Sequence, residues 1–182
     1  VILSNSTNVD HFNENKITIR NVGSTQFPDG TLFEVIVTNS SGCSITSSAA
    51  TLTVNEIKDV LPTSSTVTQC YGTDYSYEVV TSYPANVVSY QWKSSVVSGV
   101  WNDVVDGTHF LGAKTETLQI INGTPAESAA YRVYITFDAS GADCNVDSSS
   151  RSRTISFLPE VTAPVATITQ PSCTVATGSV VL

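Results

Sequence analysis

Apolar and polar residues alternate with a period of two over most of the chain. In the segment 130–137, for example, Tyr131, Val133 and Ile135 fall on one face. Val, Ile, Thr and Tyr crowd such segments, whereas Leu, Ala and Lys show no helical spacing. The pattern therefore predicts an all-β fold.

An internal repeat appears when residues 1–57 are laid over the later part of the chain. Three stretches of the first copy recur in the same order in the second copy, and in each copy a loop with a cysteine precedes the last strand. The matched stretches are Lys16–Ile19 with Thr117–Ile120, Phe33–Thr38 with Tyr131–Thr136, and Ala50–Val54 with Arg153–Phe157, and the loop cysteines are Cys43 and Cys144. We therefore expect related modules along the chain.

The repeat predicts three parts. Residues 1–57 are expected to be the C-terminal part of one module, residues 58–161 a complete module, and residues 162–182 the start of a further β module, with strands at 166–169 and 178–182. Glu56–Pro62 and Leu158–Pro164, with proline at their edges, are interpreted as linkers.

Within residues 58–161 the alternation predicts seven strands, a number typical of an aligned two-sheet sandwich. The predicted strands are 65–69, 75–81, 87–93, 101–105, 116–121, 130–137 and 151–157.

Trp92 in the third of these strands and Tyr131 at the start of the sixth match the central tryptophan and the corner tyrosine of an immunoglobulin-like sandwich. Val133 stands where many such domains have a cysteine, so we expect Trp92, Tyr131 and Val133 to form an apolar core. The fold class we predict is a tandem of immunoglobulin-like β-sandwich modules, one complete and two partial. A β-barrel or a jelly roll remains the alternative.

Several short motifs resemble the repeated immunoglobulin-like modules of very large Bacteroidetes cell-surface adhesins. The matching segments are Cys70–Gly72, Tyr90–Trp92, Trp101 with Val104, Gly112–Thr115, Tyr131–Val133 and Cys144, and the stretch 170–179 resembles the entry to another repeat of those proteins, including the gliding-motility adhesin. The resemblance implies a secreted protein exported by the type IX system and displayed on the exterior of the outer membrane.

Four cysteines suggest a disulfide, because the chain has no C-x-x-C pair and its histidines, His11 and His109, are too scattered for zinc. We expect Cys70 and Cys144 to pair, since a sandwich could bring both to the same end. Such a bridge would stabilise the module by roughly 4 kcal/mol and suits an extracellular site. For Cys43 and Cys173 we expect partners outside residues 1–182 or unpaired thiols.

The charge of the chain argues against nucleic acid as a partner, because the net charge is -8 and no basic cluster opposes it. No apolar run is long enough for a transmembrane helix.

Nothing in the sequence suggests an enzyme or a cofactor. His11 and His109 are interpreted as surface residues, and most acidic side chains as solvated charges; a calcium site in the loop at Asp138, Asp143 and Asp147 is the weaker alternative. The other acidic residues considered are Asp103, Asp106, Glu116 and Glu127.

Three functions fit these expectations. The modules could be spacers in a stalk that projects an adhesive region from the cell, or they could bind a surface glycan or protein directly. A binding face would use the outward residues Gln91, Lys93, Arg132 and Tyr134. They could also be accessory modules of a secreted hydrolase, because sandwiches host many functions.

Overall fold

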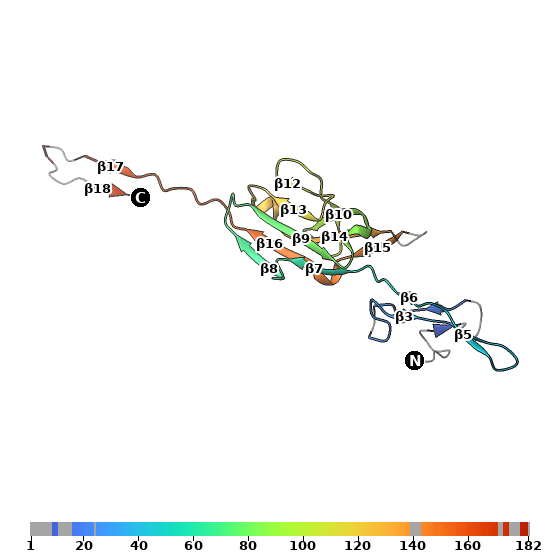
Figure 1. Ribbon diagram of the computed structural model, residues 1–182. Helices are drawn as coiled ribbons and strands as arrows, with labels where there is room; N and C mark the ends of the chain where they lie inside the picture. Colours follow the sequence, from blue (N-terminus) through green and yellow to red (C-terminus); the bar gives the residue numbers. More distant parts are fainter. Residues whose placement is uncertain are drawn as a thin grey trace. The chain divides into compact units, whose positions relative to one another are not determined.

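The computed structural model describes residues 9–10, 16–23, 25–138, 143–170, 173–174 and 179–181, and in these residues the chain is all-β (Figure 1). The only helical elements there are three single turns of 3-10 helix, η1 (Pro84–Asn86), η2 (Pro125–Glu127) and η3 (Ser149–Arg151). His11 and parts of the predicted segments around Cys144 and 170–182 lie outside the described residues.

The chain forms two compact units. The first comprises Val1–Lys58 together with Thr81–Asn86, and the second comprises Asp59–Val80 and Val87–Leu182. We describe each unit by itself.

Up to Phe157, the described residues of the second unit form two β-sheets, apart from short ends of β7 and β9 that fall in the first unit. One has the strand order β11-β10-β14-β16-β8, with β15 paired to β14, and the other has the order β12-β13-β9-β7. The strands of the first sheet are β8 (Thr66–Gln69), β10 (Val87–Ser95), β11 (Asn102–Asp103), β14 (Ala129–Phe137), β15 (Cys144–Asp147) and β16 (Arg153–Phe157). Those of the second are β7 (Ile57–Leu61), β9 (Tyr75–Thr81), β12 (Phe110–Leu111) and β13 (Thr117–Ile120).

The core of the second unit lies between these two sheets. Tyr77 of β9 stacks on Trp92 of β10, with ring centroids 6.2 Å apart, and is tilted against Tyr131 of β14 at 5.7 Å. All three side chains are fully buried, as is Val133 beside them. This aromatic contact joins one sheet to the other, so the unit is β-sandwich-like, and the predicted core residues Trp92, Tyr131 and Val133 are confirmed as buried.

The seven strands predicted from the alternation are all present, with shifts of a few residues at their ends. Three strands were missed. The stretch read as a linker at 56–62 contains β7, in which Ile57 and Val60 are buried, and β12 and β15 were read as loops. The proline at the end of β7 and the loop-like residues around β12 and β15 hid these strands from the sequence pattern.

The described residues of the first unit include three antiparallel strand pairs. They are β1 (Val9–Asp10) with β2 (Thr18–Ile19), β3 (Leu32–Phe33) with β6 (Ala50–Thr51), and β4 (Ile36–Thr38) with β5 (Ser44–Thr46). Phe27 is buried and its ring lies 5.9 Å from that of Phe33.

The strand register of the first unit repeats that of the second. Phe33 pairs with Ala50 as Tyr131 pairs with Arg153, and these are the residues that the two sequence copies align. The other two strand pairs agree in the same way: Thr38 with Ser44 matches Thr136 with Asn145, and Val9 with Ile19 matches Phe110 with Ile120. The internal repeat seen in the sequence is therefore also a repeat of strand pairing.

Near the C-terminus, β17 (Thr167–Thr169) and β18 (Ser179–Val181) form an antiparallel pair. Both strands fall in the two segments for which the sequence predicted strands. The residues from 158 to 166 contain no strand, as expected of a linker.

The predicted disulfide between Cys70 and Cys144 is wrong. All four cysteines are free and exposed. Cys144 pairs with Phe137, the last residue of β14. Cys70 follows Gln69, which pairs with Phe157 of β16. The first residue of β14 pairs with Ile155, so Phe157 and Cys70 lie beyond the N-terminal end of β14. Eight steps of about 3.3 Å along β14 separate these ends by roughly 26 Å. A disulfide requires Cα atoms within about 7 Å.

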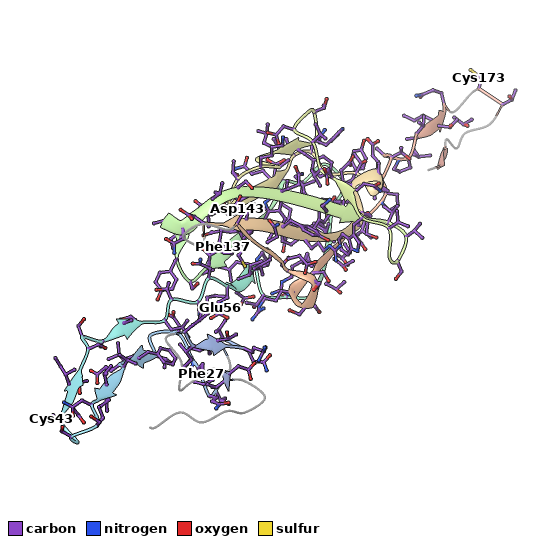
Figure 2. The ribbon with its side chains drawn as sticks, turned by 90° about the vertical axis from the view of Figure 1, so that its right-hand side faces the viewer. Phe27, Cys43, Glu56, Phe137, Asp143 and Cys173 are labelled. Carbon is purple, nitrogen blue, oxygen red and sulfur yellow. The ribbon has the colours of Figure 1, made fainter. Side chains whose placement is uncertain are left out.

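Cys43, the repeat equivalent of Cys144, lies at the tip of the β4–β5 hairpin, and Figure 2 labels it there. Because Cys70 and Cys144 do not pair, the repeat no longer predicts a disulfide partner for Cys43 or Cys173.

We predict opposite effects of removing two buried tyrosine hydroxyls. The Tyr131 hydroxyl donates a hydrogen bond to the Glu127 carbonyl at 2.7 Å, so Tyr131→Phe should lower the free energy of unfolding by about 1 kcal/mol. The Tyr77 hydroxyl is buried without a partner, so Tyr77→Phe should leave that free energy unchanged or raise it. Urea unfolding of both variants measures the difference, and a larger loss for Tyr77→Phe would contradict the assignment.

Candidate functional site

The four residues proposed as a binding face lie together on the outward side of β10 and β14. Lys93 pairs directly with Arg132, and Gln91 pairs directly with Tyr134, so the four side chains form two cross-strand pairs. Each side chain is partly buried rather than free in solvent. The sequence thus correctly predicted which residues share this face.

Arg132 is at the centre of the face. Its guanidinium lies 4.1 Å from the centre of the Trp101 ring and 4.9 Å from that of Tyr134, and it donates a hydrogen bond to the Tyr134 hydroxyl. The Asp147 carboxylate lies 3.8 Å from the guanidinium. Arg132 is thus held between two aromatic rings and a carboxylate, an arrangement that favours a fixed cation.

Lys93 and Gln91 also have partners inside the unit. The Lys93 ammonium lies 2.6 Å from Asp103 on β11 and 4.9 Å from the centre of the Tyr134 ring. The Gln91 amide donates to the carbonyls of Trp92 and Val104, at 2.8 and 3.0 Å. Lys93 thus connects β10 to β11, and Gln91 connects β10 to Val104, directly after β11.

We call the set Trp101, Lys93, Arg132, Tyr134 and Asp147 the cation–aromatic ladder. Lys93 comes from β10, Arg132 and Tyr134 from β14, Asp147 from β15, and Trp101 directly precedes β11. The two cations contact the two rings, and acidic residues of the same unit lie beside both cations. Such a ladder stabilises a sheet face, and its main groups are already engaged with one another. Sequence reasoning missed Trp101 as a member because its contact with Arg132 joins two residues that are distant in sequence.

The pKa of Asp147 is held below its ordinary value, chiefly by a hydrogen bond from Ser149, with further contributions from the backbone, Arg132 and Tyr134. A lowered pKa in the folded state means that ionised Asp147 stabilises the fold above its unfolded pKa. That contribution is lost as the pH falls through the folded pKa.

Two of the acidic residues read as solvated charges instead bind backbone amides. Asp106 accepts the N–H of Ala113 at 2.7 Å. Glu127 accepts from both the N–H and the hydroxyl of Thr124 in a capping box at η2, at 2.9 and 2.7 Å. Both carboxylates therefore hold loops of the sandwich in place.

Among the described residues, His109 contacts a backbone carbonyl and the acidic residues do not gather into a metal site. His109 has its Nδ1 atom 3.1 Å from the carbonyl oxygen of Ile121. In the part of the chain that the structure describes, no three His, Cys, Asp or Glu side chains are grouped to hold a metal ion. Among the same residues, no helix has the length and apolar character needed to cross a membrane.

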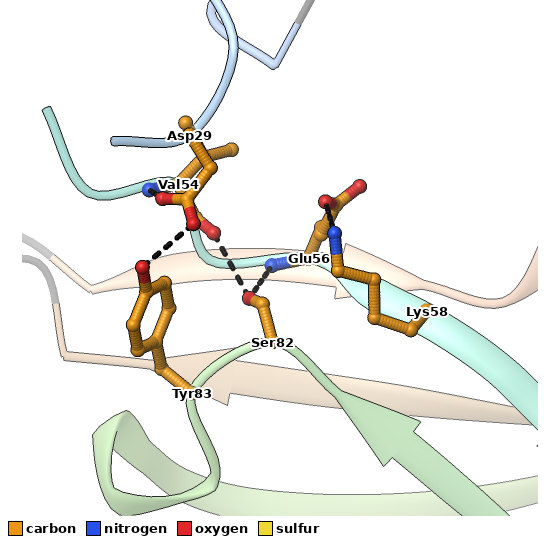
Figure 3. Close-up of polar contacts among 6 residues, drawn as sticks. All are labelled: Asp29, Val54, Glu56, Lys58, Ser82 and Tyr83. Carbon is orange, nitrogen blue, oxygen red and sulfur yellow. Dashed lines mark hydrogen bonds and ion pairs between the residues drawn. The ribbon is translucent and has the colours of Figure 1, made fainter. Parts of the chain in front are cut away.

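A second polar cluster lies in the first unit, which includes the segment 81–86 (Figure 3). Asp29 accepts the Tyr83 hydroxyl at 2.6 Å and the Val54 N–H at 2.8 Å. Ser82 donates its hydroxyl to the Val54 carbonyl and accepts the N–H of Glu56, at 2.9 and 3.0 Å. These bonds attach the segment 81–86 to the end of the first sequence copy.

The hydrogen bond from Tyr83 is the largest of the effects that lower the pKa of Asp29, and the N–H of Val54 adds to it. The same bond raises the pKa of Tyr83. Both shifts favour the pair in which Asp29 is ionised and Tyr83 is protonated. Ionised Asp29 therefore stabilises the first unit above its unfolded pKa, and this contribution disappears as the pH falls through its folded pKa.

Comparison with known proteins gives no family for this chain. No family model matches the sequence, and no curated protein matches it.

We predict that Arg132 contributes more to stability than Lys93. Arg132→Gln removes two cation–aromatic contacts from a side chain that is 15% exposed, so the free energy of unfolding should fall by about 1 to 2 kcal/mol. Lys93→Gln, the matched change on the neighbouring strand, should cost about 0.5 kcal/mol because its partner Asp103 is largely in solvent. Urea unfolding of the two variants decides this, and equal losses would refute a central role for Arg132.

We predict that Tyr83→Phe raises the pKa of Asp29 toward its ordinary value, because the variant removes the strongest of its hydrogen bonds. A titration of the Asp29 carboxyl carbon by NMR measures the pKa in both proteins. Ser82→Ala is the control, since it changes the same segment without touching the carboxylate. An unchanged pKa in Tyr83→Phe would show that the bond does not form in solution.

Proposed function

We propose that this chain is a non-catalytic segment of tandem immunoglobulin-like modules, acting as a spacer in the stalk of a large secreted cell-surface protein involved in adhesion. The observation that carries the proposal is the path of the chain through the second unit. β8, the first strand of the sheet β11-β10-β14-β16-β8, runs parallel to β16, its last strand in the sequence. The chain therefore enters this sheet at one end and leaves it at the opposite end.

Side-chain and backbone contacts hold both ends of this path. At the entry, buried Arg153 at the start of β16 donates to the carbonyl of Val60 and pairs with Asp59, at 2.9 and 2.8 Å. At the exit, the N–H of Leu158 donates to the carbonyl of Gln69 at 2.9 Å. A module built in this way can be joined head to tail with others, which is what a stalk requires.

The strand order supports the immunoglobulin-like assignment. In an immunoglobulin sandwich one sheet has the order A-B-E-D and the other contains C, F and G. The order β7-β9-β13-β12 corresponds to the first sheet, and β10-β14-β16 corresponds to the second. The bond from the Tyr131 hydroxyl to the Glu127 carbonyl has the form of a tyrosine corner, and Trp92 is buried on β10, which corresponds to strand C.

The location outside the cell is part of the proposal and rests on the resemblance of the sequence to Bacteroidetes surface adhesins. Export by the type IX system, display on the outer-membrane exterior and a role in surface gliding come from that resemblance alone. The free cysteines give no support to an oxidising compartment. Direct binding through Gln91, Lys93, Arg132 and Tyr134 is the less favoured function, because each of these side chains already has a partner within the unit.

Mechanical unfolding of the whole chain tests the spacer role. Pulling by the two termini loads β8 and β16 along their length, so their hydrogen bonds must break together. The comparison variant has all four native cysteines changed to serine and carries new attachment points at Ser64→Cys and Ser152→Cys. These two residues precede β8 and β16 at the same end of the pair. Pulling on them therefore opens the hydrogen bonds between β8 and β16 one after another. We expect a clearly lower unfolding force with these handles than with handles at the termini.

The contour length released in each event identifies the second unit and so serves as the internal control. Equal unfolding forces in the two pulling directions would mean that the parallel pair bears no load, and the spacer proposal would fail.

A further inference from the structure

The sheet β12-β13-β9-β7 has a hollow of about 420 Å³ on its outer face. Its lining residues come from β9, from the start of β13, and from the end of β7 with the two residues that follow: Ser76, Glu78, Thr117, Leu61, Pro62 and Thr63. All six lie in the second unit and in the stretch 25–138, every residue of which is described. Because β9 is paired along both edges, the hollow belongs to a fully paired part of the sheet.

The alternation of β9 explains how polar side chains reach this face. Tyr77 and Val79 are buried in the core, so Ser76 and Glu78 point outward. Thr117 pairs directly with Glu78 across β13 and β9, and therefore faces the same way. Hydroxyl groups and one carboxylate thus share the hollow with the apolar residues at the end of β7.

Glu78 differs from the other acidic residues of the described strands because no cation lies beside it. Each of the others forms an ion pair with an arginine or a lysine. The pairs are Asp10 with Arg20, Asp59 with Arg153, Asp103 with Lys93, and Asp147 with Arg132. In the part of the chain that the structure describes, the Glu78 carboxylate has neither an ion pair nor a hydrogen bond. A free carboxylate in a chain with a net charge of -8 favours a cationic ligand.

We propose that this hollow binds an arginine side chain of a polypeptide partner. A guanidinium has several N–H donors and no acceptor, which suits a carboxylate with hydroxyl oxygens around it. The Glu78 carboxylate can accept two parallel hydrogen bonds from it. The methylenes of an arginine pack on apolar surface, which Leu61 and Pro62 supply at the hollow.

A polypeptide is the source of this arginine because the hollow is exposed. Ser76 and Glu78 are both exposed, so a single small cation would make few contacts there. An arginine that anchors a larger interface is held by the contacts around it as well. The proposal rests on the unpaired carboxylate and not on the spacer role.

The test uses the whole chain and two peptides, acetyl-Gly-Arg-Gly-amide and its citrulline analogue, which keeps the shape of arginine without its charge. Backbone amide signals of the residues around the hollow, followed by NMR, should shift on addition of the arginine peptide. The Kd should lie in the millimolar range, because only one side chain is bound. The citrulline peptide should shift these signals far less, and added salt should weaken the binding.

Two matched variants of the chain locate the acceptor. Glu78→Gln should weaken binding by about tenfold, because it removes the charge and keeps the shape of the side chain. Glu116→Gln removes the same charge from an exposed residue that adjoins Thr117 but does not line the hollow, and it should bind as the parent chain does. Both positions are exposed, so both variants should fold, which their amide spectra check.

The proposal fails if the arginine peptide shifts no signals around the hollow. If methyl glycosides shift those signals instead, the hollow is a saccharide site. Equal losses of binding in Glu78→Gln and Glu116→Gln would show that the peptide responds to the net charge of the chain, which would also overturn the proposal.

Discussion

The central position of β14 is the constraint on which the rest of the sandwich depends. This strand is paired along both edges, to β10 on one side and to β15 and β16 on the other, and every second residue from Ala129 to Phe137 is buried. Its inward side chains meet Tyr77 of the opposite sheet through Tyr131, and its outward side chains carry Arg132 and Tyr134. One alternating strand therefore supplies both the core and the ladder on the outer face.

The two faces of β14 differ in how they are stabilised. The inner face excludes water, and its contacts are apolar and aromatic. The outer face keeps its cations by stacking them on rings and by placing Asp103 and Asp147 beside them. In a chain with only 13% charged residues, this concentration of charge on one sheet face looks at first like a ligand site. The mutual engagement of its groups makes a structural role the simpler explanation.

The two units share a pattern of strand pairs but differ in how far the side chains of those strands are buried. The first unit repeats the strand pairs of the second, with the same register, yet Val35 and Val37 remain exposed. Pairing within a hairpin is local, whereas burial requires a second layer that other strands must supply.

The sequence by itself determined the all-β class, seven strands of the sandwich, the internal repeat and the buried residues Trp92, Tyr131 and Val133, because these follow from a period of two and from local spacing. It did not determine β7, β12 and β15: β7 lies in a stretch with proline at its edge, and the other two lie in stretches that the sequence pattern marked as loops. Only the tertiary structure decided that Cys70 and Cys144 lie at opposite ends of β14, and that Arg132 stacks on Trp101. Such positions depend on strand direction and register, which are set by contacts between residues distant in sequence.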